Sequence, residues 1–221
     1  MPPPSTEADR EATAGFLMKL RGRGVRDLAV LRALEATPRT LFTPRRYRDL
    51  AFREMHLPIA CGQSMPDPFF VARLASAAAI GPEHRVLEIG AGSGYCTAIF
   101  ARLAAEVLSL ERWRALAIEA ALRLETLGVV NAACEWADGR EIPAVAGRFD
   151  RIIAHALCDA DDLAALVKAL TDDGALLAGK AGPYGETRLV RLTPGARGVP
   201  VERDCGPARL TPLLQGLSDA L

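Results

Sequence analysis

The sequence predicts an α/β protein with a doubly wound, mostly parallel sheet, a helical N-terminal cover and an antiparallel edge strand. Short apolar runs alternate with segments of helical periodicity, which is typical of a parallel sheet with helices on both faces. The length of 221 residues and a charged fraction of 24% fit one globular fold with a small appendage. We expect a helical extension over residues 1–60, packed on a core domain over residues 61–221.

The N-terminal cover is predicted from two short amphipathic patterns. Apolar residues recur there at helical spacing, at Phe16, Leu17 and Leu20 and again at Leu28, Leu31 and Leu34. The basic stretch 44–54 mixes charge with aromatic residues. We interpret it as a solvated linker that packs its aromatic rings inward, rather than as a patch for nucleic acid.

A further helix is predicted over residues 68–80. Asp67 is a good N-cap, Pro68 suits the first helical position, and Gly81-Pro82 would stop the apolar run.

Five apolar runs are expected to form the parallel strands, at residues 85–89, 106–110, 132–137, 150–155 and 175–180. Helical patterns separate some of them, with apolar positions at Leu116, Ala120 and Leu124 and at Leu163, Leu166 and Leu170. Residues 188–192 and 208–214 are typical of late strands at an antiparallel edge.

Charge and hydropathy exclude several classes of partner. Lysine plus arginine and aspartate plus glutamate both number 27, so no net positive field is available to hold a nucleic acid. The chain has no run of about 18 apolar residues and no basic start followed by an apolar stretch. We therefore expect a cytoplasmic protein without a membrane segment, with a monomer as the favoured state.

Cysteine and histidine spacing indicates no metal site. The cysteines are widely separated, with no close pair, and are interpreted as free buried thiols: Cys61, Cys96, Cys134, Cys158 and Cys205. The histidines share no ligand spacing such as HExxH; they are His56, His84 and His155. The sequence therefore predicts no metal-dependent mechanism.

The strongest local motif is a glycine loop that follows the strand over residues 85–89. Gly90, Gly92 and Gly94 permit a tight turn and leave backbone amides bare beside the next helix, so that a ligand can approach the main chain closely. About 20 residues further on, Glu111 ends the next predicted strand, where it can accept both hydroxyl protons of a ribose. Together these features predict a nucleoside site.

The spacing of the glycines narrows the type of nucleoside. A dinucleotide loop has G-x-G-x-x-G, but here the third glycine comes one residue early and Tyr95 stands where it would fall, so a nicotinamide oxidoreductase is disfavoured. The G-x-G-x-G form, with Glu88 two residues before it, resembles the S-adenosylmethionine loop of class I methyltransferases. That resemblance implies that Asp138, which precedes Gly139, faces the adenine amino group.

The chain from about Leu31 to Leu214 resembles the protein-L-isoaspartate (D-aspartate) O-methyltransferase family. The likeness rests on LPIACGQSMPDPFFVARL (57–74), VLEIGAGSGY (86–95), LER (110–112), ADG (137–139), FDRII (149–153), LTDDGALLAG (170–179) and RLTPLL (209–214). It implies a Rossmann-like methyltransferase fold, with residues 61–221 as the domain that binds S-adenosylmethionine. It also implies methyl transfer to the α-carboxylate of L-isoaspartyl or D-aspartyl residues in damaged proteins or peptides, which starts their repair.

The resemblance and the loop pattern together give the candidate site residues. Those expected to bind the cofactor are Gln63, Ser64, Met65, Glu88, Gly90, Gly92, Ser93, Gly94, Tyr95, Glu111, Arg112, Asp138 and Gly139. Those expected near the reacting groups are Pro66, Asp67 and His155. No catalytic triad is expected, because a substrate carboxylate is already ionised near neutral pH and needs no base before it attacks.

Two departures from the family pattern leave the methyl acceptor open. Pro66 stands where the family has its characteristic serine, and it offers neither a hydroxyl nor a backbone N–H; Ser64 replaces a threonine. His155 stands where the family has a small or hydroxylated residue, and it could bind a substrate carboxylate, act as a base or simply be a satisfied histidine. The alternatives are the same fold and cofactor with another acceptor, or a catalytically silent cofactor-binding protein.

Overall fold

The fold is built on a mixed sheet that confirms the predicted α/β class. The structure is a computed structural model that describes residues 7–142 and 146–219. Within these residues the large sheet has the order β5-β4-β3-β6-β7-β8-β9. The strands are β3 Arg85–Ile89, β4 Glu106–Glu111, β5 Ala132–Trp136, β6 Phe149–Leu157, β7 Leu170–Ala181, β8 Thr187–Thr193 and β9 Val201–Pro207. Strands β3 to β7 pair in parallel, whereas β8 and β9 are antiparallel.

Both faces of this sheet are buried, because successive residues of its central strands enter opposite cores. Val86 and Ile153 pack on the side of the N-terminal helices, while Leu87 and Ile152 pack on the other side. Helix α4 Pro68–Ala78 precedes β3, whereas α5 Tyr95–Ala101 follows β3, α6 Arg114–Thr126 follows β4 and α7 Ala160–Lys168 follows β6. The near-continuous apolar strands of the sequence are thus explained by a sheet with two covered faces.

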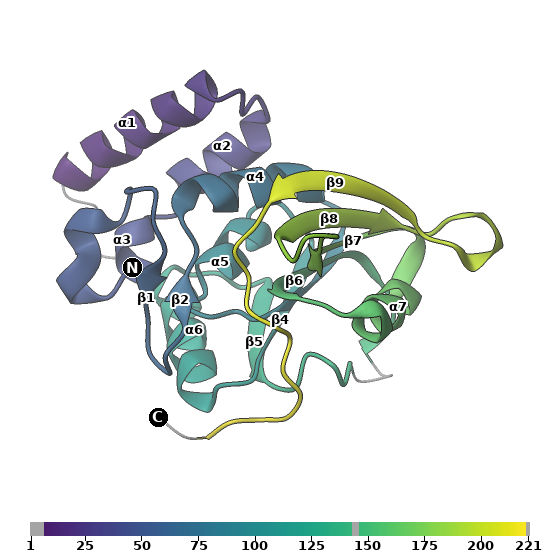
Figure 1. Ribbon diagram of the computed structural model, residues 1–221. Helices are drawn as coiled ribbons and strands as arrows, with labels where there is room; N and C mark the ends of the chain where they lie inside the picture. The colour runs from purple at the N-terminus through teal and green to yellow at the C-terminus, as the bar shows by residue number, and fades with distance from the viewer. Residues whose placement is uncertain (1–6, 143–145, 220–221) are drawn as a thin grey trace.

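The predicted helical cover is confirmed. It consists of α1 Glu7–Gly22, α2 Leu28–Glu35, α3 Arg39–Phe42 and the 3-10 helix η1 Arg45–Leu50. Helix α2 lies over α4 and α5, and Figure 1 shows α1 and α2 together at one end of the molecule. The residue-60 boundary between extension and core domain stays a prediction.

The predicted start of helix α4 is also confirmed. Asp67 accepts hydrogen bonds from the backbone N–H groups of Phe69 and Phe70, and Pro68 is the first helical residue. The helix ends earlier than the apolar run, because Ala79 adopts a left-handed conformation with φ of 48°. A short hairpin, β1 Leu57–Pro58 with β2 Ser64–Met65, precedes the helix and was not predicted.

The edge of the sheet differs from the prediction in one segment. Residues 208–214 form no strand and make one isolated bridge, Leu157 with Pro212, whereas the last strand is β9. Pro207 directly before this segment and Pro212 within it have no N–H to donate to a neighbouring strand, which favours an irregular course over a paired strand. Leu170 likewise starts β7 and does not continue α7, which ends at Lys168.

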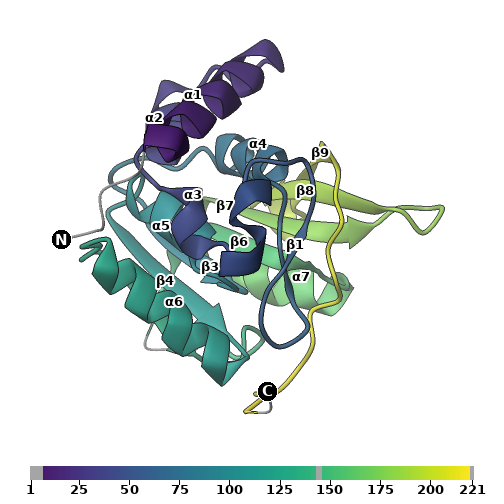
Figure 2. The same ribbon diagram turned by 90° about the vertical axis from the view of Figure 1, so that its left-hand side faces the viewer.

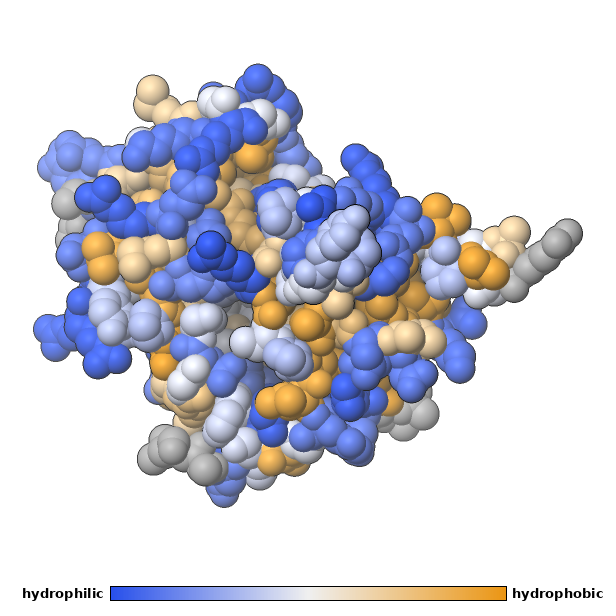
Figure 3. Space-filling model, viewed as in Figure 1, coloured by the Kyte–Doolittle hydropathy of each residue, from blue (hydrophilic) through white to orange (hydrophobic). Residues whose placement is uncertain are grey.

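The segment after β9 runs back across the molecule to the C-terminus, as Figure 1 shows in yellow. Figure 2 shows this segment on the side of the molecule that carries the loop between β1 and β2, and residues of both line one cavity. Hydrophilic residues cover much of the face in Figure 3, interrupted by smaller hydrophobic areas. None of the helices in the described ranges is long and apolar enough to span a membrane. The predicted cytoplasmic location and monomeric state stay predictions.

Candidate functional site

A cavity of about 340 Å³ opens at the carboxyl ends of the parallel strands, and we call it the central cavity. Ligands of open α/β sheets bind at this edge, and the volume suits a small organic molecule. Its walls are the loop over residues 59–66, the glycine loop, the ends of β4 and β6, and residues 209–214. The predicted site residues that line it are Gln63, Ser64, Met65, Pro66, Gly90, Gly92, Ser93, Tyr95, Glu111, Arg112, Gly139 and His155.

Four predicted residues do not line the central cavity: Asp67, Glu88, Gly94 and Asp138. Asp67 caps helix α4 and borders a neighbouring groove instead. Gly94 is the N-cap of α5 and packs against helix α6, which explains its position behind the loop.

The glycine loop has the backbone that its sequence requires. Gly90, Gly92 and Gly94 have φ of 88°, 56° and 83°, a region that residues with a Cβ rarely adopt. At Gly94 an added Cβ would lie 3.0 Å from the Cβ and 3.2 Å from the Cα of Ala120. The tight turn therefore brings α5 against α6 while its amides stay at the cavity edge.

Glu111 joins the glycine loop to the end of β4. Its Oε2 accepts a hydrogen bond of 2.8 Å from the N–H of Gly92, and its Oε1 accepts one of 2.9 Å from the N–H of Trp113. Burial raises the pKa of the Glu111 carboxyl, while the N–H groups of Trp113 and Gly92 act to lower it. Each oxygen keeps a further lone pair, so the fixed carboxylate can accept two vicinal hydroxyl groups, as a ribose presents them. These residues therefore fit an adenosine cofactor.

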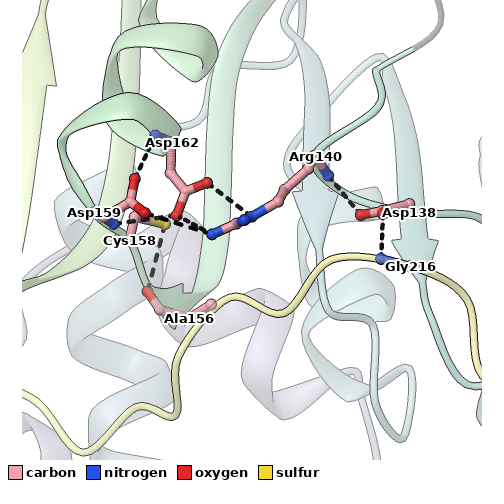
Figure 4. Close-up of polar contacts among 7 residues, drawn as sticks. All are labelled: Asp138, Arg140, Ala156, Cys158, Asp159, Asp162 and Gly216. Carbon is pink, nitrogen blue, oxygen red and sulfur yellow. Dashed lines mark hydrogen bonds and ion pairs between the residues drawn. The ribbon is translucent and has the colours of Figure 1, made fainter.

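The second predicted acid, Asp138, is engaged by the C-terminal segment (Figure 4). Its Oδ2 accepts a hydrogen bond of 2.5 Å from the N–H of Gly216, and its Oδ1 accepts one of 2.9 Å from the N–H of Arg140. The Arg140 guanidinium reaches across to Asp162 near the start of α7. Gly139 reaches the cavity wall, but the Asp138 carboxylate already has partners, so its predicted contact with adenine stays a prediction.

Glu88 lies beneath the glycine loop and is fully buried. One carboxylate oxygen accepts hydrogen bonds from the hydroxyls of Thr97 and Ser109, and the other lies 2.8 Å from Nε2 of His155. Strand alternation places this side chain on the α5 face of the sheet, away from the cavity wall. The Glu88 carboxylate thus contacts other side chains of the protein and does not line the central cavity.

His155 is held at the end of β6 by two neighbours. Besides its contact with Glu88, its ring stacks on Phe100, with an interplanar angle of 14°. Burial acts to lower the pKa of His155, but Cys96 and Glu88 act in the opposite direction and raise it to about 10. The imidazole is therefore a protonated, partnered group at the edge of the cavity near neutral pH.

The loop over residues 59–66, which we call the wall loop, is held in place by a buried arginine. Arg39 is fully buried and donates from Nε to the carbonyl of Ala51 and from Nη2 to the carbonyl of Pro66, at 2.7 and 2.5 Å. Its guanidinium also lies over the ring of Tyr95, 4.7 Å from the centroid. One side chain thus links the N-terminal cover, the wall loop and helix α5.

Sequence reasoning missed the C-terminal wall of the cavity. Residues 209–214 line it, and Thr211 and Leu213 bond to the backbone of Leu157 at the end of β6. The sequence predicts a late strand over residues 208–214, and RLTPLL also contributes to the family likeness, but neither indicates a cavity wall. His56 and Cys96 also line the cavity, and neither belongs to a motif that would predict this.

Comparison with known proteins agrees with this geometry. The family model for protein-L-isoaspartate (D-aspartate) O-methyltransferases matches residues 11–202. A protein-L-isoaspartate O-methyltransferase from Rhodopseudomonas palustris is 43% identical over 206 residues, covering 93% of this chain and 95% of the relative. One from Azorhizobium caulinodans is 40% identical over 216 residues, covering 98% and 99%.

Solved structures of low sequence identity show the same fold. A protein-L-isoaspartate O-methyltransferase from Plasmodium falciparum, in complex with S-adenosyl-L-homocysteine, matches with a TM-score of 0.76 at 20% identity, covering 90% of this chain and 97% of that one. Another of the same name has a TM-score of 0.80 at 19% identity, covering 93% and 67%. The family model and the bacterial relatives span most of the chain, so this chain belongs to the protein-L-isoaspartate (D-aspartate) O-methyltransferase family.

Proposed function

We propose that this chain transfers a methyl group from S-adenosylmethionine to the α-carboxylate of L-isoaspartyl or D-aspartyl residues in damaged proteins or peptides. The observation that carries the proposal is the Glu111 carboxylate, which is fixed by the Gly92 and Trp113 N–H groups on the wall of the central cavity. In a chain of this family, that arrangement suits the ribose of the cofactor. The cofactor supplies a methyl group on a positively charged sulfur.

The residues of the cavity divide between the two ligands in this proposal. Glu111 holds the ribose hydroxyls, while the glycine loop and the wall loop at Gln63 and Met65 enclose the rest of the cofactor. Pro66 and His155 line the same cavity. They therefore border the place where an acceptor would meet the methyl group.

No residue has to remove a proton from the acceptor, because its carboxylate is ionised near neutral pH. The chain contributes by holding the two reactants in line and by excluding water. Pro66 cannot donate a hydrogen bond to the acceptor, but His56 and Arg209 line the cavity and carry donor groups. A serine hydroxyl at position 66 is therefore not needed to bind a carboxylate here.

The acceptor is tested with a pair of peptides. Purified protein, S-adenosylmethionine carrying a labelled methyl group, and an isoaspartyl peptide should give a base-labile methyl ester. The twin peptide with a normal aspartate should give none, since its side-chain carboxylate lies on a different backbone geometry. Cofactor binding without ester formation on the isoaspartyl peptide would show that isoaspartyl residues are not the acceptor. The chain would then be a methyltransferase with another substrate or a catalytically silent cofactor-binding protein.

The Pro66→Ser variant tests the departure from the family pattern. It restores a hydroxyl on the wall loop and keeps the backbone carbonyl that accepts from Arg39. We expect ester formation on the isoaspartyl peptide to be equal or higher, measured as initial rate at saturating cofactor. Pro66→Ala is the matched control, because it gains the same backbone N–H as Pro66→Ser but adds no hydroxyl. A sharp loss in Pro66→Ser, but not in Pro66→Ala, would show that a hydroxyl here harms acceptor binding.

A further inference from the structure

Three side chains with metal-ligating atoms meet beneath the central cavity. Glu88 comes from β3, Cys96 from the first turn of α5 and His155 from β6. One ligand atom from each lies within 4.8 Å of the others, and the carboxylate and the thiol are buried. His155 lies far along the chain from Glu88 and Cys96, which explains why spacing in the sequence gives no sign of the cluster.

The donor set has a clear chemical preference. Imidazole nitrogen, thiolate sulfur and carboxylate oxygen are the ligands that Zn²⁺ takes in proteins, whereas Mg²⁺ and Ca²⁺ require oxygen ligands. With bond lengths of about 2.0–2.3 Å, neighbouring ligand atoms of a tetrahedral zinc site lie about 3.3–3.8 Å apart. The three side chains therefore need only small rotations to close around an ion.

The surroundings of the cluster already orient two of the ligands. The Glu88 oxygen that faces away from His155 accepts from Thr97 and Ser109, which leaves the other oxygen directed at the cluster. The His155 ring is held in its plane by Phe100. Supporting contacts of this kind are what hold ligand side chains in metal sites.

The cluster is also accessible from one side. Cys96 and His155 both line the central cavity, while Glu88 closes the cluster from the protein interior. An ion bound there has three protein ligands and a fourth position toward the cavity, where water or a ligand carboxylate can bind. This is the arrangement of an open zinc site rather than a closed structural one.

We propose that Glu88, Cys96 and His155 bind one zinc ion in the floor of the central cavity. Binding releases the thiol proton of Cys96 and the proton shared by His155 and Glu88 to solvent, so that a thiolate, a neutral imidazole and a carboxylate face the cation. The ion then occupies the wall beside the place assigned to the methyl acceptor. Zinc is therefore expected to inhibit methyl transfer, a consequence that alone rests on the proposed function.

Cobalt provides a direct probe, because it substitutes for zinc and a thiolate ligand adds an intense charge-transfer absorption band. Full-length protein, freed of metal with a chelator that is then removed, is titrated with Co²⁺. We expect the band to saturate at one equivalent and to disappear when Zn²⁺ is added. Cys96→Ser and His155→Gln should each lose the band. The double variant Cys61→Ser, Cys205→Ser should keep it, since both thiols lie outside the cluster.

Thermal unfolding shows whether a variant that lacks the cobalt band is still folded. Zn²⁺ should raise the unfolding temperature of the unaltered protein and not that of Cys96→Ser, whose own unfolding is first recorded in chelator. The proposal is overturned if the protein gives no cobalt–thiolate band, or if the band persists in Cys96→Ser. Neither readout involves methyl transfer, so failure of the proposed function and failure of the metal site are separately visible.

Discussion

Replacing Glu111 with alanine should abolish most of the affinity of the chain for S-adenosylmethionine. The carboxylate is positioned to accept two ribose hydroxyls, and hydrogen bonds to charged groups contribute about 1.5–3 kcal/mol each. A net loss of about 3 kcal/mol corresponds to a dissociation constant about 100-fold higher. Isothermal titration calorimetry measures this dissociation constant directly.

Two controls separate ligand binding from loop structure in this experiment. Glu111 also accepts from the Gly92 N–H, so its removal loosens the glycine loop. Glu111→Gln keeps the shape and one acceptor oxygen, and should bind with intermediate affinity. Glu135→Ala removes an exposed carboxylate from the neighbouring strand β5 and should bind normally. Unchanged affinity in Glu111→Ala would show that Glu111 does not bind the ribose of the cofactor.

Gly94→Ala should be the most destabilising of the single-methyl additions in the glycine loop. An alanine in the left-handed region costs about 1–2 kcal/mol, and its Cβ would press on Ala120, including the backbone of α6. Overpacking of this kind adds about 1–3 kcal/mol. We expect the free energy of unfolding to fall by about 2–5 kcal/mol in urea denaturation.

Gly128→Ala is the matched control for the cost of placing an alanine in the left-handed backbone conformation. Gly128 has φ of 66°, and a Cβ there would have no neighbour within 4 Å. The free energy of unfolding of Gly128→Ala should therefore fall only by the cost of the left-handed conformation, about 1–2 kcal/mol. The difference between the two variants measures the contact of α5 with α6. Equal losses in both would contradict that contact.

The sequence was sufficient for the α/β class and for the positions of the parallel strands, because apolar strands and helical patterns are local signals. The glycine loop and Glu111 were also predictable, since each stands at the end of a strand and parallel strands end at one edge. The direction of the Glu88 side chain was not predictable. Both faces of β3 are buried, so the hydrophobic pattern does not say which face receives a polar residue.

The remaining differences arise from contacts between distant segments. Gly216 reaches Asp138 only because the C-terminal segment crosses the molecule, and no local pattern encodes that path. The same holds for the irregular wall over residues 209–214, which is held by Leu157. Cys96 and His155 meet through the packing of α5 on the sheet; the sequence draws attention to His155 but gives no sign that Cys96 is its neighbour.

Arg39 has a consequence for how the protein unfolds. Its guanidinium is sheltered only when Ala51, Pro66 and Tyr95 are all in place, and its Nη1 has no hydrogen-bond partner among the described residues. A charge that stays buried after losing one of its partners is costly, so opening either the N-terminal cover or the loop at Pro66 destabilises the other. Residues 7–50 and the ligand-binding half are therefore coupled into one cooperative unit, and neither is expected to melt while the other stays ordered.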